Sequence, residues 1–277
     1  MTDDCNVCGW DGLVHRVVSM TDILAGVVLA AGLGRRLRPL TVDHPKALCP
    51  VDDVPLVDHA LARFGSLVGG VDGLAVNVHH HRRAVEAHLD GRVHLSVEAA
   101  EALGTAGALG HLRGWIDGRA TLVVNADAWC PGSVDPLVEG WDGERLRVLV
   151  VGEDGLGPRS RVAGALLPWS EVARLEAVPT GLWEVSWRAA LEEGRLEAVR
   201  HDGPFVDCGT PAQYLEANLL ASGGESVIGA GAQVAAPVVR SVVWPGSTVR
   251  AGEALVDAIR FDGHRTVLVR EAGRLRS

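Results

Sequence analysis

Residues Leu29–Lys46 read LAAGLGRRLRPLTVDHPK, and this stretch decides the fold. The continuous apolar run at residues 23–30 leads into it and predicts a buried parallel strand. The loop Gly32–Gly34 then lets backbone N–H groups approach phosphate oxygens, and three arginines follow. No third glycine completes a dinucleotide fingerprint, and no Gly-Lys-Ser/Thr makes a P-loop. The order of strand, glycine loop and arginines predicts a phosphate-binding loop of another kind.

The lysine that ends this stretch, Lys46, is the only lysine in the chain. Arginine supplies the positive charge everywhere else, apart from the histidines. A position that keeps lysine indicates a need for a compact ammonium, which the planar guanidinium of arginine does not imitate. The alternative is that a single lysine survived by chance in an arginine-rich chain. The neighbouring arginines Arg36 and Arg38, which can form paired hydrogen bonds to phosphates, favour the functional interpretation.

Composition bounds the class of protein. The chain has 277 residues, 47% of them hydrophobic, which is typical of a globular protein with one large domain or a large and a small one. A net charge of −9 argues against a general nucleic-acid or membrane-surface binder. No apolar run is long enough to span a bilayer, and the first residues are acidic, unlike a signal peptide. We therefore expect a cytoplasmic protein without nucleic-acid or membrane partners.

The five cysteines are odd in number and widely spread, which indicates free thiols. Cys5 and Cys8 form a Cys-x-x-Cys pair that could be half of a zinc site or a redox pair, although no second such pair exists. Met20 could be the true start of translation. We expect residues 1–22 to be a flexible N-terminal extension.

The next hundred residues alternate between predicted strands and helices. Apolar runs at 74–78, 93–97 and 121–125 predict strands, and amphipathic segments predict helices at 55–68, 82–89 and 105–113. This alternation predicts an α/β fold with a mostly parallel sheet and helices on both faces, over residues 23–222. Such sheets bind ligands at the carboxyl ends of their strands, where residues 32–46 and 125–127 would both lie.

The spacing of the apolar residues changes from about residue 223. Apolar residues recur there at spacings of six, nine, six and six residues, with Gly, Ala, Pro and Ser between them: Ile228, Val234, Val243, Val249 and Leu255. These spacings predict a short left-handed β-helix of hexapeptide repeats over residues 223–277, with room for one or two turns. Its open end would need to be covered by the main domain or by a second subunit, giving a homo-oligomer. The alternative is an irregular apolar tail.

Two aspartates follow apolar segments at the expected ligand edge. Asp127 follows the predicted strand at 121–125, and Asp207 follows the segment 204–206. Mg²⁺ prefers one or two carboxylates together with phosphate oxygens and water, so the pair is suited to it. For each aspartate the alternative role is a helix N-cap, particularly for Asp207, which precedes the helix-start pair Thr210-Pro211.

On these residues the chain resembles the sugar-1-phosphate nucleotidyltransferases, or nucleoside-diphosphate-sugar pyrophosphorylases. The family motif L-A-x-G-x-G-x-R-L-x-P-L-T-x-x-x-P-K is matched in full from Leu29 to Lys46. Later family motifs have counterparts in the same order: Asn77–His80, Glu98, Leu103–Leu109, Asn125–Asp127 and Val206–Pro211. The pattern is most similar to mannose-1-phosphate guanylyltransferases and to guanylyl- or uridylyltransferases for heptose or amino-sugar phosphates.

The resemblance implies an enzyme that transfers a nucleoside monophosphate from a nucleoside triphosphate to a sugar 1-phosphate, releasing pyrophosphate. It implies a Rossmann-like nucleotidyltransferase fold with Mg²⁺ on Asp127 and Asp207, and catalytic roles for Arg36 on the β- and γ-phosphates and Lys46 on the α-phosphate. The residues that it implies at the nucleotide are Leu29, Ala30, Ala31, Gly32, Gly34, Glu98, Gly104 and Thr105. Asn125 would contact the sugar substrate.

One departure from the family pattern stands out. The family usually carries a Glu-Lys-Pro motif whose lysine holds the sugar phosphate, and this chain has no second lysine. Arg159 and Arg161 are the candidates to replace it. Without a replacement, the chain would bind sugar phosphate weakly, take another acceptor, or be a catalytically weak regulatory homologue of such an enzyme. A cytidylyl- or molybdopterin-type transferase on the same fold is a further alternative.

Overall fold

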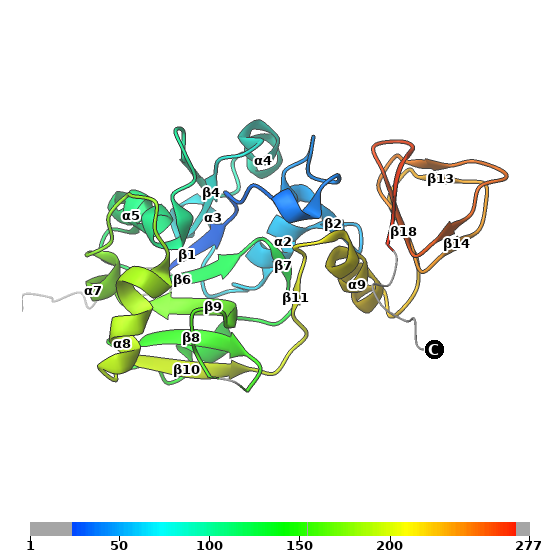
Figure 1. Ribbon diagram of the computed structural model, residues 1–277. Helices are drawn as coiled ribbons and strands as arrows, with labels where there is room; N and C mark the ends of the chain where they lie inside the picture. The colour runs from blue at the N-terminus through cyan, green and yellow to red at the C-terminus, as the bar shows by residue number, and fades with distance from the viewer. Residues whose placement is uncertain (1–23, 154, 270–277) are drawn as a thin grey trace, which may run out of the picture.

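The computed structural model describes residues 24–153 and 155–269 (Figure 1). The expected extension over residues 1–22 and the Cys5/Cys8 pair lie outside the described residues. In the part of the chain that is described, no helix has both the length and the apolar character needed to cross a bilayer.

A seven-stranded sheet forms the centre of the fold, in the order β10-β8-β9-β6-β1-β4-β5. Neighbouring strands run parallel except at β9, which is antiparallel to both β6 and β8, so the predicted mostly parallel sheet is confirmed. The strands are β1 (Leu24–Leu29), β4 (Leu74–Val78), β5 (His94–Val97), β6 (Ala120–Asn125), β8 (Leu146–Val151), β9 (Arg161–Leu167) and β10 (Leu196–His201).

Helices cover both faces of this sheet, and each face buries its own apolar cluster (Figure 1). One face packs against α2 (Leu56–Ala62), α4 (Arg82–Leu89) and α6 (Asp135–Val138). The other face packs against α5 (Gly104–Ile116), α7 (Trp169–Val172) and α8 (Arg188–Glu192). Two short segments complete the main body: α3 (Gly70–Gly73) and the π-helical turn η3 (Trp183–Trp187).

The predicted helix boundaries were accurate in one case and wrong in two. Helix α4 has the predicted bounds, whereas α5 runs from 104 to 116 instead of 105 to 113. The helix predicted over 55–68 ends at Ala62, and the buried Phe64 and Val68 lie in the turns that follow. Both side chains still pack in the core. Their spacing fits a helix, but turns can bury apolar residues at the same spacing.

The strand order reverses beside β1. The chain passes from β1 outward to β4 and β5, then returns to place β6 on the other side of β1. Leu29 and Asn125 are partners at the carboxyl ends of β1 and β6, and Ala126 N donates to Leu29 O. Such a switch point opens a crevice for a ligand, because the two loops diverge to opposite sides.

Short elements connect this crevice to the end of the chain. The single turns η1 (Arg35–Leu37) and η2 (Lys46–Leu48) follow β1, and the hairpin β2 (Pro50–Val51) and β3 (Val54–Pro55) follows them. An antiparallel ribbon joins β7 (Ala128–Trp129) to β11 (Val206–Asp207). Asp207 therefore ends a strand, and that strand belongs to this ribbon instead of the main sheet. Helix α9 (Pro211–Ala221) comes next.

Residues 227–268, called here the C-terminal strand region, form short strands that pair parallel with strands 15 to 17 residues later. Three pairs, β12–β15, β13–β16 and β14–β17, lie on different sides of a triangular outline (Figure 1). The chain then ends in an antiparallel hairpin of β18 and β19. The strands are β12 (Val227–Ile228), β13 (Gln233–Val234), β14 (Val238–Val239), β15 (Val242–Val243), β16 (Thr248–Val249), β17 (Leu255–Val256), β18 (Ala258–Phe261) and β19 (Arg265–Leu268).

A row of glycines on α5 lets the segment 176–180 cross the helix at backbone distance. A Cβ added at Gly107 would meet Val178 O at 2.2 Å, and one at Gly110 would meet the Glu176 carbonyl at 2.4 Å. Gly104 has φ of 71° and would meet Thr180 O at 2.5 Å. Ala106 N also donates to Thr180 O, so the crossing is hydrogen-bonded as well as close. These glycines hold the segment against the start of α5.

Because the segment 176–180 lies so close to α5, alanine at one glycine of this helix should destabilise the protein, the opposite of what helix propensity predicts. Gly110→Ala should lower the free energy of unfolding by about 1–3 kcal/mol, because the methyl group meets backbone that cannot move aside. Gly114→Ala is the matched control on the same helix, where a Cβ meets nothing within 4 Å. It should raise stability by up to about 1 kcal/mol, the gain of alanine over glycine in a helix. Urea unfolding measures both; a stabilised Gly110→Ala would contradict the crossing.

Candidate functional site

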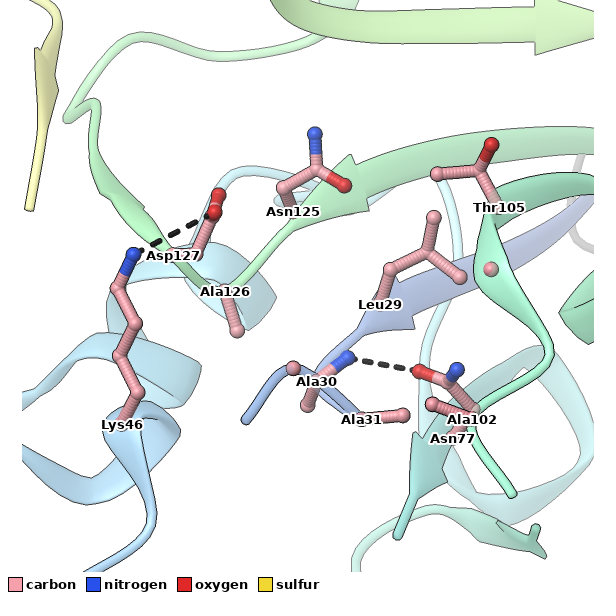
Figure 2. A pocket seen from close by; sticks show the side chains of 12 residues that line it. Leu29, Ala30, Ala31, Lys46, Asn77, Ala102, Thr105, Asn125, Ala126 and Asp127 are labelled. Carbon is pink, nitrogen blue, oxygen red and sulfur yellow. Dashed lines mark hydrogen bonds and ion pairs between the residues drawn. The ribbon is translucent and has the colours of Figure 1, made fainter. Parts of the chain in front are cut away.

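A cavity of about 200 Å³ opens at the switch point, between the carboxyl ends of β1, β4 and β6 and the start of α5 (Figure 2). Its lining comes from five separate segments of the chain. The lining residues are Leu29, Ala30, Ala31, Gly32, Lys46, Asn77, Ala102, Gly104, Thr105, Asn125, Ala126 and Asp127. Nine of the fifteen residues expected at the site from the sequence line this cavity: Leu29, Ala30, Ala31, Gly32, Lys46, Gly104, Thr105, Asn125 and Asp127.

The loop after β1 turns sharply at Gly34, whose φ of 58° is the left-handed region that favours glycine. Thr41 Oγ1 donates to Gly34 O at 2.7 Å and closes the loop on itself. A Cβ at Gly34 would lie 3.1–3.2 Å from Thr41 and from the Cβ of Lys46. Gly34 therefore lies behind the cavity wall, where it brings the start of the loop against Lys46.

Lys46 is the centre of charge in the site. Its side chain is only 8% exposed, and its Nζ lies 3.4 Å from Asp127 Oδ2 and 3.7 Å from Asp207 Oδ1. Figure 2 shows the ammonium pointing to Asp127 across the cavity mouth. A buried ammonium is costly unless it is paired, so the two carboxylates hold it in position. The two aspartates that the sequence singled out are thus brought to the same atom.

Arg36 lies on the exposed side of this cluster, with its side chain 70% exposed and Nη2 donating to Asp207 Oδ2 at 3.4 Å. A Cβ at Gly209 would lie 2.6 Å from that nitrogen, so glycine leaves room for the contact. Thr210, rather than Asp207, caps α9, since its Oγ1 accepts from Gln213 N at 3.3 Å. The N-cap alternative for Asp207 is therefore wrong.

The carboxylates suit a divalent cation in one specific respect. Asp207 Oδ1 is buried and has no hydrogen-bond partner, although a buried carboxylate oxygen normally has one. Among the described residues, no group of three or more His, Cys, Asp and Glu side chains forms a metal site. Two carboxylates with open positions match Mg²⁺, which takes its remaining ligands from phosphate and water.

Asn77 and Glu98 fix the opposite wall. Asn77 Oδ1 accepts from Ala30 N at 2.7 Å, and Asn77 Nδ2 donates to Glu98 Oε1 at 2.7 Å (Figure 2 shows the first bond). Glu98 Oε2 accepts from Leu103 N at 2.8 Å. The Glu98 carboxylate, predicted to line the nucleotide pocket, is instead 3% exposed and absent from the cavity lining. It holds the segment before α5 against the loop after β1.

Burial shifts the pKa of two thiols and a histidine near the site. Burial, and to a lesser extent the nearby Cys208, raises the pKa of the Cys49 thiol to about 12. Burial also raises the pKa of the Cys208 thiol to about 12. The positive charge of Lys46 lowers the pKa of both thiols, but by less than burial raises it. With pKa values this high, the two thiols pack in the core and do not act as nucleophiles. Burial, then the neighbouring His81 and His79, lowers the pKa of His80.

Arg159 and Arg161 are not brought into the cavity. Both are exposed, and Arg161 begins β9 opposite Val151, the last residue of β8. Because β9 is antiparallel, this position is on the same edge of the sheet as the cavity. Asn77, Ala102 and Ala126 also line the cavity, although no individual role at the site was predicted for them. Asn77 had a usable signal, a polar residue near the end of an apolar strand, whereas the two alanines carry none.

Comparison with known proteins agrees with this geometry. The sequence model of the family described as Nucleotidyl transferase matches residues 25–150. The N-acetylmuramate alpha-1-phosphate uridylyltransferase of Caulobacter vibrioides is 38% identical over 69% of this chain and 94% of its own length. A mannose-1-phosphate guanyltransferase of Emericella nidulans is 23% identical over 71% of this chain and 64% of its own.

Among solved structures, a protein described as a glucose-1-phosphate thymidylyltransferase from Bacillus anthracis superposes with a TM-score of 0.61. The two share 22% identity, and the match covers 72% of this chain and 95% of that one. At this identity the likeness concerns the fold, the α/β arrangement with a mostly parallel central sheet.

The wall formed by Asn77 and Glu98 makes a prediction about stability. Glu98→Gln should lower the free energy of unfolding by about 1–3 kcal/mol, because an amide cannot accept from both Asn77 and Leu103 with both of its ends. Glu101→Gln, at an exposed position on the same segment, is the matched control and should change stability by less than about 0.5 kcal/mol. Equal values for the two variants in urea unfolding would show that the network contributes little.

Proposed function

This chain belongs to the nucleotidyl transferase family, and we propose that its cavity transfers a nucleoside monophosphate from a nucleoside triphosphate to a sugar 1-phosphate. The observation that carries the proposal is the buried Lys46 ammonium at the mouth of the cavity, with Asp127 and Asp207 on either side. A phosphoryl-transfer site needs this combination, a fixed positive charge for the phosphate that reacts and carboxylates for a cation.

The reaction is an in-line displacement. An oxygen of the sugar phosphate forms a bond to the α-phosphorus, the bond from that phosphorus to the bridging oxygen breaks, and pyrophosphate leaves. The nucleophile is already an anion, so no general base is needed. Catalysis then consists of positioning and of stabilising negative charge, which Lys46 supplies at the α-phosphate and Arg36 at the β- and γ-phosphates.

We assign Mg²⁺ to Asp127 and Asp207, supported by the buried Oδ1 of Asp207, which accepts no hydrogen bond. When bound, the cation neutralises charge on the phosphate oxygens and aligns the two substrates. Gly32, Gly104, Thr105 and Asn125 all line the cavity. We place the nucleotide against Gly32, Gly104 and Thr105, and the sugar against Asn125 at the end of β6.

The acceptor and donor are proposed from the relatives. The bacterial relative with 38% identity carries the name of a uridylyltransferase for an amino-sugar phosphate, so UTP with such a phosphate is the first pair to test, and GTP with mannose 1-phosphate is the second. Arg159 and Arg161 are the proposed replacements for the missing family lysine, since Arg161 begins β9 at the ligand edge of the sheet and Arg159 lies two residues before it.

For the C-terminal strand region we propose a left-handed β-helix of hexapeptide type, supported by its parallel pairing on three sides. Its outer surface carries exposed apolar side chains, among them Val239 and Val256 on paired strands. These favour association with a second copy of the chain.

The assay for the main proposal is pyrophosphate release with Mg²⁺ over a grid of nucleoside triphosphates and sugar 1-phosphates. Lys46→Ala should reduce kcat by about 10²–10³-fold for the productive pair, the scale of losing one preorganised charge. Lys46→Arg should recover little of this, because a guanidinium does not fit between the two carboxylates as a compact ammonium does.

Silence of the wild type over the whole grid, with nucleotide binding retained, would overturn the transferase proposal. It would favour the regulatory homologue, to which the missing lysine motif also points.

A second prediction concerns the sugar phosphate. Arg161→Ala or Arg159→Ala should raise KM for the sugar 1-phosphate by about tenfold, the loss of one charge-assisted contact, and leave KM for the nucleotide unchanged. Arg145→Ala is the matched control, because Arg145 precedes β8 at the opposite edge of the sheet. If neither variant differs from Arg145→Ala, another group holds the sugar phosphate.

A further inference from the structure

We propose that Asp262 and Arg265, in the hairpin of β18 and β19, are positioning residues for Lys46. The C-terminal strand region would then form part of the active-site machinery rather than an appended module. The inference rests on the proposed function for its kinetic consequences, whereas the contacts that carry it are independent of that function.

The first contact reaches the residue two positions before the lysine. His44 Nε2 is hydrogen-bonded to Asp262 Oδ1, and the imidazole packs edge-on against Trp244 with ring centroids 5.3 Å apart. Arg265 Nη1 donates to Asp43 Oδ2 at 3.0 Å and to Asp262 Oδ2 at 3.1 Å. Three side chains of the C-terminal strand region therefore hold two consecutive residues of the catalytic loop.

The hairpin turn is itself a rigid support. Asp262 and Gly263 have φ of 47° and 78°, as in tight hairpin turns, and Phe261 and Arg265 are paired across it. Thr248 N donates to Gly263 O at 2.7 Å, which fixes the tip of the turn to β16. The backbone that carries Asp262 is therefore held at several points, which fixes the position of its carboxylate beside His44.

The connection from His44 to Lys46 is short and stiff. Pro45 separates them with φ of −68°, and its ring prevents rotation about that bond. The turn that carries Lys46 is closed by hydrogen bonds from Leu48 N to Pro45 O and from Cys49 N to Lys46 O, both 3.0 Å. A shift of His44 is therefore transmitted to the lysine instead of being absorbed between them.

The C-terminal strand region also holds the chain beyond the lysine. The buried Tyr214 hydroxyl donates to Pro50 O and accepts from Trp244 Nε1 at 2.9 Å. Asp53 Oδ2 accepts from Ala230 N at 3.0 Å. Lys46 thus lies between two fixed points, His44 and Pro50. An ammonium that must meet two carboxylates and a phosphate depends on such support, because a shift of about 1 Å in a catalytic group can cost about a hundredfold in rate.

The chain offers an uncommon test, because Lys46 is its only lysine. Labelling with an amine-specific reagent, followed by peptide mass spectrometry, reports the accessibility of this one side chain, apart from the terminal amine. In Asp262→Ala we expect Lys46 to be labelled several-fold faster than in wild type. Asp257→Ala is the matched control, since Asp257 also pairs with an arginine of the same region, Arg240 at 2.8 Å. It should label as wild type does.

Kinetics provide the second readout. Asp262→Ala should lower kcat by about tenfold to a hundredfold with little change in the sugar-phosphate KM. In the double variant with Lys46→Ala, Asp262→Ala should lower kcat by less than about a further twofold. A residue that acts only through Lys46 has no effect once that lysine is removed. Full additivity, or an Asp262→Ala enzyme identical to Asp257→Ala in labelling and kcat, would overturn the proposal.

A second variant covers the case in which Asp262→Ala does not fold, and the labelling assay covers the case of an inactive wild type. If Asp262→Ala does not fold, Asp43→Asn replaces it, since that carboxylate is 66% exposed and its loss removes only the contact with Arg265. The same direction of change, smaller in size, is expected, and no change in labelling overturns the proposal. If the wild type has no transferase activity, the labelling comparison still decides the positioning role, so the two failures are separable.

Discussion

The ion pairs of Lys46 are the interaction on which the arrangement of the site depends. An ammonium that is 8% exposed must have partners, and its two partners come from different parts of the fold. Asp127 follows β6 of the central sheet, whereas Asp207 lies on the ribbon that leads to α9 and the C-terminal strand region. The sheet, the loop after β1 and the ribbon must therefore all be in place before the charge is balanced, which couples the site to the whole chain.

Close backbone approach is the second constraint, and small residues meet it on both sides of the cavity. Gly34 allows the loop after β1 to fold against Lys46, and the glycines of α5 allow the segment 176–180 to cross that helix. Between these two places the Asn77–Glu98 pair connects the loop after β1 to the segment before α5. The cavity is thus bounded by backbone held in place by a few buried polar contacts, which suits a site that must recognise phosphate and sugar oxygens.

The family motif and the C-terminal strand region meet at Asp43 and His44. These residues occupy positions that the motif leaves unspecified, just before its proline and lysine. In the fold they are the points where a separate body of short strands contacts the catalytic loop. One apolar cluster also spans this junction, with Leu37 and Leu40 of the loop packed together with Tyr214, Trp244 and Phe261. Charge pairing and burial therefore act together at the boundary.

Local periodicity and a contiguous motif were enough to predict the alternating strands and helices and the glycine loop. They also singled out Lys46, Asp127 and Asp207, which the fold brings together. The sequence did not determine the reversed direction of β9, the early end of α2 or the internal role of Glu98. The direction of β9 is seen only in its antiparallel pairing with β6 and β8. The hydrogen-bond partners of the Glu98 carboxylate are Asn77, 21 residues upstream, and the backbone of Leu103. Only the tertiary structure brought Asp262 to His44, 218 residues apart, since no local pattern encodes a contact between a hairpin turn and a distant loop.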